Sequence, residues 1–565
     1  MKPSPSTNQL VRMSNVIIQQ STTTASTTRY RLKTTSTRGT LNAGPLKGSL
    51  NQPTNQQQQQ SNQSRSFLPH LDYKSLKAKT LSGSLPSNIK LRNIANTDPF
   101  SVVALYDKRV SADFDLAELR KLRNKIAADV KALAKQKTSN QNSDAFQTLQ
   151  QRGRALKQEI AEKEHALSQL DLNLYDEARH LPNDTCPSVP IGDESKAEVL
   201  DIINKHKIPP PPTPETLDSI KNHVDLCSLH DMADFTRASK VSGSGFYFLK
   251  NFGALFELAL QRYAIETLTL HHGFTPVTVP DIIRHEVLEA CGFSPRAGVQ
   301  DPQTYFLNTH LDPSQHQHHT NTTNAAAFDP MRLCLAATAE FPLAAMHAGE
   351  VLKPSELPIK YVGLGRAFRA EGLAGSINRG LYRVHQFSKV EMFGLVAGGS
   401  GKEALERSEA MMEEFKSIQQ SLFEGLEICF RILNMPTEEL GAPAYKKYDM
   451  EAWMPGKNAW GEISSTSNCT DYQSRRLNIR NFPQSQSTDS PSGGGEATTT
   501  NLDFVHTING TAAAIPRLLI ALVETHQNSK GDVYVPLALR PFLLGGKVDV
   551  IKAGESFGDV MKRIR

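Results

Sequence analysis

The chain has 565 residues, ample length for two or more domains of roughly 150 residues each. Its net charge of +5 and isoelectric point near 8.7 are compatible with an RNA partner, but equally with a basic tail on a neutral enzyme. The six cysteines are scattered and form no CxxC pair, which argues against a disulfide framework or a thiolate zinc site and for a reducing compartment. No run of about 18 apolar residues occurs, so no membrane-spanning segment is expected.

Residues 1–70 differ from the rest in composition. They contain eight basic residues and no acidic one, and Ser, Thr and Gln fill most of the remainder. Such a segment is typical of a mitochondrial transit peptide, which predicts a location in the mitochondrial matrix. The alternative is a disordered basic tail on a cytoplasmic protein, because polar tracts bury too little apolar surface to fold.

Residues 90–182 have the pattern of two long amphipathic helices. Asp115–Glu118 has the form of a capping box and is expected to begin the first helix. Apolar residues recur at spacings of three and four on both sides of a polar turn at 138–143, which predicts an antiparallel coiled-coil hairpin. From the residues alone, the basic side of the first helix favours a solvated face over an RNA contact. Its members are Lys121, Arg123, Lys125, Lys131, Lys135 and Lys137.

Residues 183–224 are predicted to form a hinge and a proline-rich linker, since the prolines at 209–212 and 214 stiffen the chain. A larger domain, with alternating patterns that indicate strands, is expected over 225–565. Low-complexity stretches near 312–327 and 483–500 are interpreted as surface insertions, where added length costs little. The histidines within the first stretch lack a rigid scaffold or helical spacing, so no zinc site is expected there.

The most informative segments are Gly365–Glu371 and Arg379–Glu391. Their alternation predicts two strands joined by a loop at 372–380, with Arg369 and Glu371 on one face of the first strand. Burying so many unpaired charges would be costly, so the charged face is interpreted as a polar ligand site. A solvated, salt-bridged hairpin is the alternative. The expected face of the second strand consists of Arg383, His385, Phe387, Lys389 and Glu391.

These two segments resemble motif 2 of the class II aminoacyl-tRNA synthetases, and their residues are close to those of the seryl-tRNA synthetases. Other stretches resemble further family features in the same order. The resemblance implies an α+β fold, in which helices flank a largely antiparallel sheet and a helical hairpin arm precedes it. The matching stretches are Leu181–Gly192 (the hinge), Lys240–Leu249 (the start of the catalytic core), Gly273–Pro280 (motif 1), Thr338–Glu340, Glu462–Ser465 and Asn509–Arg517 (motif 3).

The resemblance also implies a function. A serine–tRNA ligase activates L-serine with ATP and Mg²⁺ and transfers it to the terminal adenosine of serine tRNA, which the hairpin arm holds. A homodimer through motif 1 is expected, with no membrane partner. The alternative is a catalytically inactive, synthetase-like RNA-binding protein, which the retained catalytic set argues against.

By resemblance, Arg369 and Arg517 are the catalytic residues. Arg369 would bridge the serine carboxylate and the α-phosphate, and Arg517 would contact the γ-phosphate or the adenine ring. Phe387 would stack beneath adenine, and Glu462 and Ser465 would hold Mg²⁺. The ATP-binding set is Arg369, Glu371, Phe387, Glu462, Ile463, Ser464, Ser465 and Arg517. The serine-binding set is Thr338, Glu340, Arg369, Glu391, Asn509 and Thr511, of which Thr338 and Glu340 are expected to share a strand face.

Two residues depart from the family pattern. Ala337 replaces a proline, and Pro516 replaces the glycine before the motif 3 arginine. Pro516 is tolerated if the helix begins near Ala513 and costs a hydrogen bond if it begins at Thr511. It also resembles the organellar members, which supports the transit-peptide interpretation.

Overall fold

The computed structural model describes residues 71–95, 97–135, 144–208, 220–293, 303–307, 332–371, 380–399, 401–483 and 502–565. The predicted transit segment, the proline run at 209–214, the stretches 312–327 and 484–500 and most of the motif 2 loop lie outside these residues. Within the described residues, no helix is long and apolar enough to cross a membrane.

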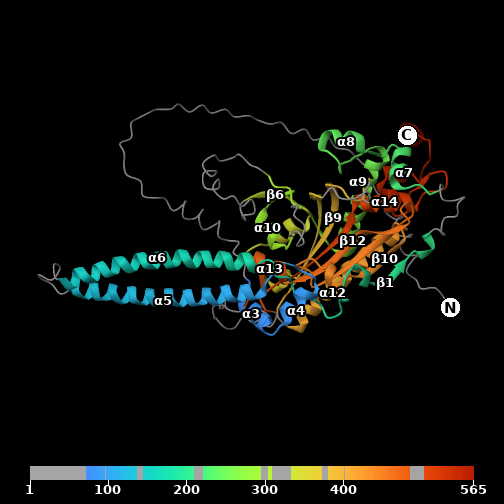
Figure 1. The fold of residues 1–565 in the computed structure, drawn as a ribbon. Coiled ribbons are helices and arrows are strands. Elements are labelled where there is room, and N and C mark those ends of the chain that lie inside the picture. The colour runs from blue at the N-terminus through green and yellow to red at the C-terminus, as the bar shows by residue number, and fades with distance from the viewer. Residues whose placement is uncertain are drawn as a thin grey trace, which may run out of the picture. The chain divides into compact units, whose positions relative to one another are not determined.

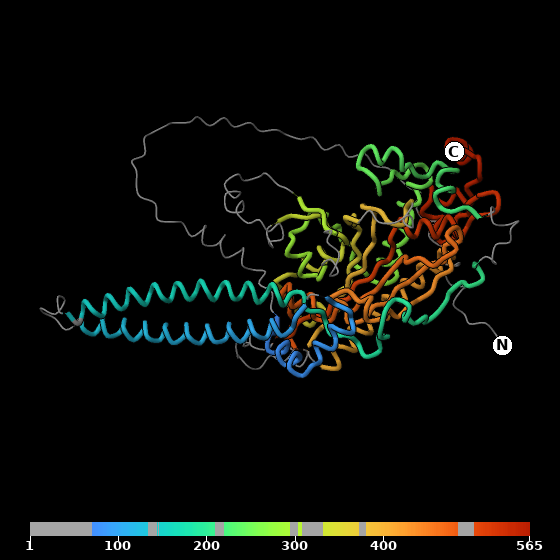
Figure 2. Tube along the Cα trace, viewed as in Figure 1, coloured from blue at the N-terminus to red at the C-terminus, as the bar shows by residue number. Residues whose placement is uncertain are grey.

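Two long helices form the predicted hairpin and lie side by side (Figures 1 and 2). They are α5 (Pro99–Lys135) and α6 (Asp144–Ala178). At 1.5 Å per residue, the 37 residues of α5 extend over about 55 Å. The helix start predicted at Asp115 is wrong, because the apolar stripe continues upstream. Asp98 accepts a hydrogen bond from the backbone N–H of Phe100 at 2.9 Å and caps the helix, with Pro99 in its first turn.

The base of the arm contains two further helices, α3 (Tyr73–Leu81) and α4 (Ser84–Leu91), so the helical part begins before residue 90. They pack against α5 and α6 through a small apolar cluster that includes Leu85 and Leu174. The buried Arg92 donates to the carbonyl oxygens of Asp184 at 2.8 Å and Ala444 at 2.7 Å. These bonds connect the base of the arm to the hinge and to the larger domain.

The larger domain is built on an eight-stranded sheet in the order β1-β10-β11-β12-β15-β9-β8-β4. All neighbouring strands are antiparallel except β4 and β8, which agrees with the expected α+β fold. β1 lies in the segment that was predicted to be hinge and linker. The sequence did not indicate this strand, because it is a largely exposed edge strand without a buried apolar face. The strands are β1 (Glu198–Ile203), β10 (Phe430–Asn434), β11 (Lys446–Met454), β12 (Ala459–Thr470), β15 (His506–Ala514), β9 (Gln386–Val396), β8 (Ile359–Phe368) and β4 (Thr275–Thr278).

Helices cover both faces of this sheet. Val390 and Met392 of β9 belong to a core shared with α9 (Asn251–His272), α12 (Lys402–Gly425) and α14 (Ile515–Thr525). Phe393 and Leu395 of the same strand point to a second core, shared with α10 (His285–Ala290), α11 (Glu340–Ala345) and α13 (Tyr472–Leu477). The remaining elements are α7 (His223–Leu229), α8 (Phe235–Ser242), α15 (Phe557–Ile564), β2 (Ala233–Asp234), β3 (Phe248–Leu249), β5 (Ile282–Arg284), β6 (Leu333–Leu335), β7 (Val351–Leu352), β13 (Arg480–Asn481), β14 (Asp503–Phe504), β16 (Val533–Tyr534) and β17 (Val550–Ile551).

Candidate active site

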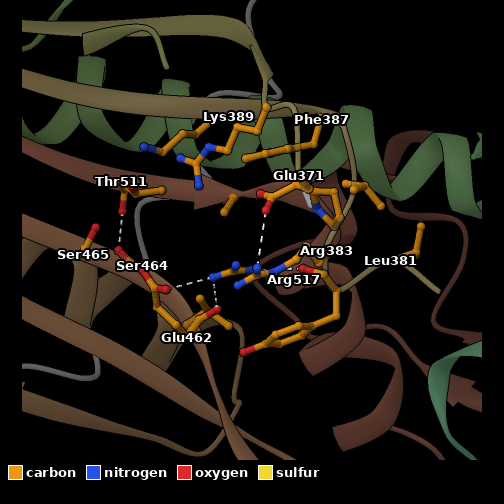
Figure 3. A pocket seen from close by; sticks show the side chains of 16 residues that line it. Glu371, Leu381, Arg383, Phe387, Lys389, Glu462, Ser464, Ser465, Thr511 and Arg517 are labelled. Atoms are coloured by element: carbon orange, nitrogen blue, oxygen red, sulfur yellow. Dashed lines mark hydrogen bonds and ion pairs between the residues drawn. The ribbon is translucent and has the colours of Figure 1, made fainter. Parts of the chain in front are cut away.

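A cavity that is open to solvent lies where β9, β12 and β15 meet the start of α14 (Figure 3), and the free space inside it and in its mouth is about 540 Å³. Four basic and two acidic side chains line it, a balance that suits an anionic ligand. The structure brings nine of the predicted site residues together on its wall. They are Arg369, Glu371, Phe387, Glu462, Ile463, Ser464, Ser465, Thr511 and Arg517.

Arg369 and Glu371 do not lie on a strand as predicted. β8 ends at Phe368, the last residue paired with β9, and the chain then turns toward the cavity. The backbone N–H of Arg369 still donates to the carbonyl oxygen of His385 at 2.9 Å, and this bond holds the turn in place. Arg383 and His385 likewise precede β9, which begins at Gln386.

The guanidinium of Arg369 is poised for an anion. Its Cζ lies 5.4 Å from the centre of the Phe387 ring, and its buried Nε has no hydrogen-bond partner among the described residues. Burial lowers the pKa of Arg369, and the neighbouring positive charge of Arg517 lowers it further. A negatively charged ligand would relieve both effects.

Arg517 lies in the first turn of α14. This helix begins at Ile515, so Pro516 is in the first turn. The N–H that proline lacks therefore breaks no helical hydrogen bond, as expected for a helix that does not begin at Thr511. Arg517 Nη1 donates to Glu462 Oε2 at 2.9 Å, and the two side chains point toward each other in Figure 3. Burial disfavours the charge of Arg517, but Glu462 and Tyr382 outweigh that effect and raise its pKa.

Glu462 and Ser465 both reach the cavity because β12 is irregular. Residues three apart on a regular strand point to opposite faces. Here Ser464 pairs with Met450 and Glu462 with Glu451, so Ile463 is an extra residue that forms a bulge and returns both side chains to one wall. Burial alone would raise the pKa of Glu462, but Arg517 and Lys447 outweigh it and lower that pKa.

Thr338 and Glu391 form a buried group next to the cavity and are joined by Lys389, which lines it. Lys389 Nζ lies 2.5 Å from Glu391 Oε2 and donates to Thr338 Oγ1 at 3.1 Å. The Thr338 hydroxyl in turn donates to Glu391 Oε2 at 3.1 Å. The three side chains therefore fix one another's orientation.

Glu340 does not share a strand face with Thr338 as predicted. β6 ends at Leu335, and Glu340 is the first residue of α11. Its Oε1 accepts from Gln473 Nε2 at 2.6 Å and from Asn509 Nδ2 at 3.0 Å. Burial and the negative charge of Glu391 raise the pKa of Glu340 to about 7.

Several residues of the site were not among those predicted. Lys389 was placed on the charged face but received no role. Tyr382 and Arg383 line the cavity, and Gln473 holds Glu340. A buried glutamine has no local sequence signal for such a contact. His385 does not line the cavity, because its ring stacks on Phe246 with the centres 5.1 Å apart.

An antiparallel sheet that carries one arginine after a strand and a second at a helix start, around a shared cavity, defines the core of a class II aminoacyl-tRNA synthetase. Family models agree. Residues 328–526 match the tRNA synthetase class II core domain (G, H, P, S and T), and residues 84–185 match the seryl-tRNA synthetase N-terminal domain.

Relatives identify the branch of this class. The serine–tRNA ligase of Treponema denticola is 38% identical over 476 residues, 84% of this chain and 98% of that protein. The mitochondrial serine–tRNA ligase of Bos taurus is 36% identical over 480 residues, 85% of this chain and 84% of that protein. A crystal structure of seryl-tRNA synthetase from Pyrococcus horikoshii complexed with ATP is 31% identical, has a TM-score of 0.64, and covers 86% of this chain and 98% of its own. This chain belongs to the seryl-tRNA synthetase family.

Proposed function

We propose that this chain activates L-serine with ATP and transfers the seryl group to the terminal adenosine of serine tRNA. The observation that carries this proposal is a cavity that Arg369 and Arg517 both line, beside the buried carboxylates of Glu340 and Glu391. The Pyrococcus relative was crystallised with ATP, which supports a nucleotide ligand here. The retained arginines and carboxylates leave no observation that favours an inactive RNA-binding protein.

In the first step, a carboxylate oxygen of serine attacks the α-phosphorus of ATP and the bond to pyrophosphate breaks. Two anions must approach each other, so the protein has to supply positive charge to both. The guanidinium of Arg369, whose buried Nε has no partner among the described residues, is suited to bridge the serine carboxylate and the α-phosphate. Arg517, which Glu462 orients, is suited to the γ-phosphate. Phe387 offers a ring for adenine, and Glu371 an acceptor for its amino group.

Mg²⁺ with ATP fits the oxygen donors on β12. The Glu462 carboxylate is ionised and 40% exposed, and the bulge at Ile463 puts Ser465 on the same wall. Among the described residues, no group of three or more His, Cys, Asp or Glu side chains could hold a metal ion. The chain would therefore supply two ligands, with phosphate oxygens and water completing the shell. Bound there, the ion would neutralise phosphate charge.

Serine would occupy the inner end of the site. Glu340 offers a carboxylate for the ammonium group, while Thr338, Glu391, Asn509 and Thr511 offer hydrogen-bonding groups near it. Because these groups are buried, a ligand without the hydroxyl leaves them unmatched, and alanine should be rejected strongly. Threonine must be rejected by its extra methyl group.

The arm is proposed to hold the tRNA. Within the described part of α5 and α6, several exposed basic side chains form no ion pair and are free to meet phosphates. Such contacts give affinity through release of counterions and position the RNA by its shape. The residues are Lys125, Lys131, Arg152, Arg154 and Lys163.

A homodimer through motif 1 is proposed as well. β4 is an edge strand of the sheet, and the neighbouring Leu270 and Ile282 are apolar yet 73% and 50% exposed. A second copy would cover both the open edge and these side chains. Light scattering on the purified protein, and on Leu270→Glu, would measure the assembly.

Two half-reactions test the function. Purified protein should exchange pyrophosphate into ATP only when serine is present, and should then charge serine tRNA. Exchange that does not depend on serine, or that alanine supports equally, would contradict the proposal.

A further inference from the structure

Gln419 is a fully buried side chain of α12 that inserts between two strands of the catalytic sheet. It has 0% exposure and stands among the apolar residues Phe415, Ile418 and Leu422 on the same helix face. It approaches from the side of the sheet opposite the cavity. A Cβ added to Gly510 of β15 would lie 3.3 Å from Gln419 Nε2 and 2.8 Å from Thr466 Oγ1. A side chain at this position would displace the Thr466 hydroxyl and crowd the amide, so glycine suits the site.

Every polar atom of the Gln419 amide has a partner. Nε2 lies 2.9 Å from the carbonyl oxygens of Ser465 and Thr511 and 2.9 Å from Ser464 Oγ. Oε1 accepts a hydrogen bond from the Thr466 hydroxyl at 2.6 Å. Because a carbonyl oxygen can only accept hydrogen bonds, the NH₂ group of the amide must be the group that faces Ser465 and Thr511, which fixes the orientation of the amide.

The sheet is open where this amide lies. β12 and β15 pair from Thr466 and Gly510 onward, but no pair joins Ser465 to Thr511. β15 also has an irregularity in its pairing with β9 between Thr511 and Ala513. At this opening both carbonyls accept a hydrogen bond from Gln419, and the Thr511 carbonyl accepts a second one from the Ser464 hydroxyl of β12. Ser465 and Thr511 line the cavity at this same opening.

We infer that Gln419 is a positioning residue for adenylate formation. Its amide spaces β12 from β15, so that Ser465 on the phosphate side and Thr511 on the serine side keep a fixed separation. Gln419 itself touches no substrate. The inference rests on the proposed function, because it assigns those two residues to the two substrates. Without the amide, the Ser465 carbonyl loses the Gln419 donor, the Thr511 carbonyl keeps the Ser464 hydroxyl, and the strands close or admit water.

Gln419→Met tests this inference, because methionine keeps the length of the side chain and removes the amide. We expect kcat/KM for serine in pyrophosphate exchange to fall at least tenfold per folded molecule. Binding of a non-hydrolysable seryl-sulfamoyl adenosine, measured by calorimetry, should weaken by a similar factor. The affinity for tRNA should not change, since the arm is untouched. Gln420→Met is the matched control, because the one side-chain bond of Gln420 within the described part of the chain is to Glu424 of the same helix.

Thr466→Val is the second variant and carries the test if Gln419→Met does not fold. It removes the hydroxyl that orients the amide, so exchange should fall severalfold. The double variant should be no worse than Gln419→Met alone, since both changes act on one hydrogen-bonded unit. A folded Gln419→Met protein with wild-type kinetic constants and analogue affinity would overturn the inference. Absence of serine-dependent exchange from the wild-type protein would instead overturn the proposed function.

Discussion

Replacement of Arg369 by lysine should preserve the fold and remove most of the activation step. The guanidinium lies above Phe387, and its buried Nε has no hydrogen-bond partner among the described residues, so the replacement removes no hydrogen bond of this nitrogen from the free protein. A lysine keeps the charge but offers a point donor in place of a planar fork. It cannot hold the serine carboxylate and the α-phosphate at once. Loss of one charge-assisted contact in the transition state should cost about 3 kcal/mol, or about a hundredfold in rate.

Serine-dependent pyrophosphate exchange measures this loss directly. Thermal melting should show a nearly unchanged midpoint, because lysine keeps the positive charge that the free protein already holds beside Arg517. Arg366→Lys is the matched control. It lies on β8, its side chain is 45% exposed, and this side chain forms an ion pair with Glu257 outside the cavity. Exchange at a near-normal rate by folded Arg369→Lys protein would refute the bridging role.

Two further predictions concern the arm and the N-terminal segment. In the first, residues 121–163 are removed and the helices are joined by a Gly-Ser linker next to the Arg120–Glu164 ion pair. This deletion should abolish tRNA charging and spare pyrophosphate exchange, because the apolar base of the arm stays intact. Loss of both activities would mean that the arm supports the core. In the second, a fluorescent reporter fused to residues 1–70 should enter mitochondria, since the membrane potential attracts a cationic, acid-free segment. A reporter that stays in the cytosol would show that this segment is a basic tail and not a transit peptide.

The sequence predicted site residues correctly where a short stretch matches a family motif. The motif around Arg369 and the one around Arg517 each predicted a cavity residue, because resemblance transfers a role one residue at a time. Strand faces were predicted less well. Simple alternation placed Thr338 and Glu340 together on a strand, whereas the chain turns after β6 and begins a helix at Glu340. Alternation applies only while the ladder is regular.

Irregular pairing was beyond the sequence for the same reason. The bulge at Ile463, which brings Glu462 and Ser465 to one wall, depends on the partner strand and not on local residues. Gln419 did carry a signal, since a polar residue at a core position of an otherwise apolar helix stripe is unusual. That signal predicts a buried hydrogen bond but not its partners, which come from strands distant in the sequence. Similarly, the capping box at Asp115 does not begin the helix, because the apolar stripe continues upstream of it.

The raised pKa of Glu340 predicts how serine use depends on pH. Burial and the charge of Glu391 put this pKa at about 7 in the free protein. If the carboxylate binds the serine ammonium group, only its ionised form is productive. For a pKa of about 7, the ionised fraction falls from roughly nine-tenths at pH 8 to roughly one-tenth at pH 6. The kcat/KM for serine should therefore fall about tenfold over this range, because this ratio follows the free enzyme.

Pyrophosphate exchange at saturating ATP and magnesium, between pH 6 and 8, measures that dependence. Glu340→Gln provides the comparison, since glutamine keeps an acceptor for Gln473 and Asn509 but does not titrate. Its kcat/KM for serine should be low throughout and flat over the same range. Because Gln473 and Asn509 both donate to Oε1, the fold should tolerate the amide and the melting midpoint should change little. If the variant keeps the wild-type slope, another group controls the pH dependence and Glu340 is not the ammonium ligand.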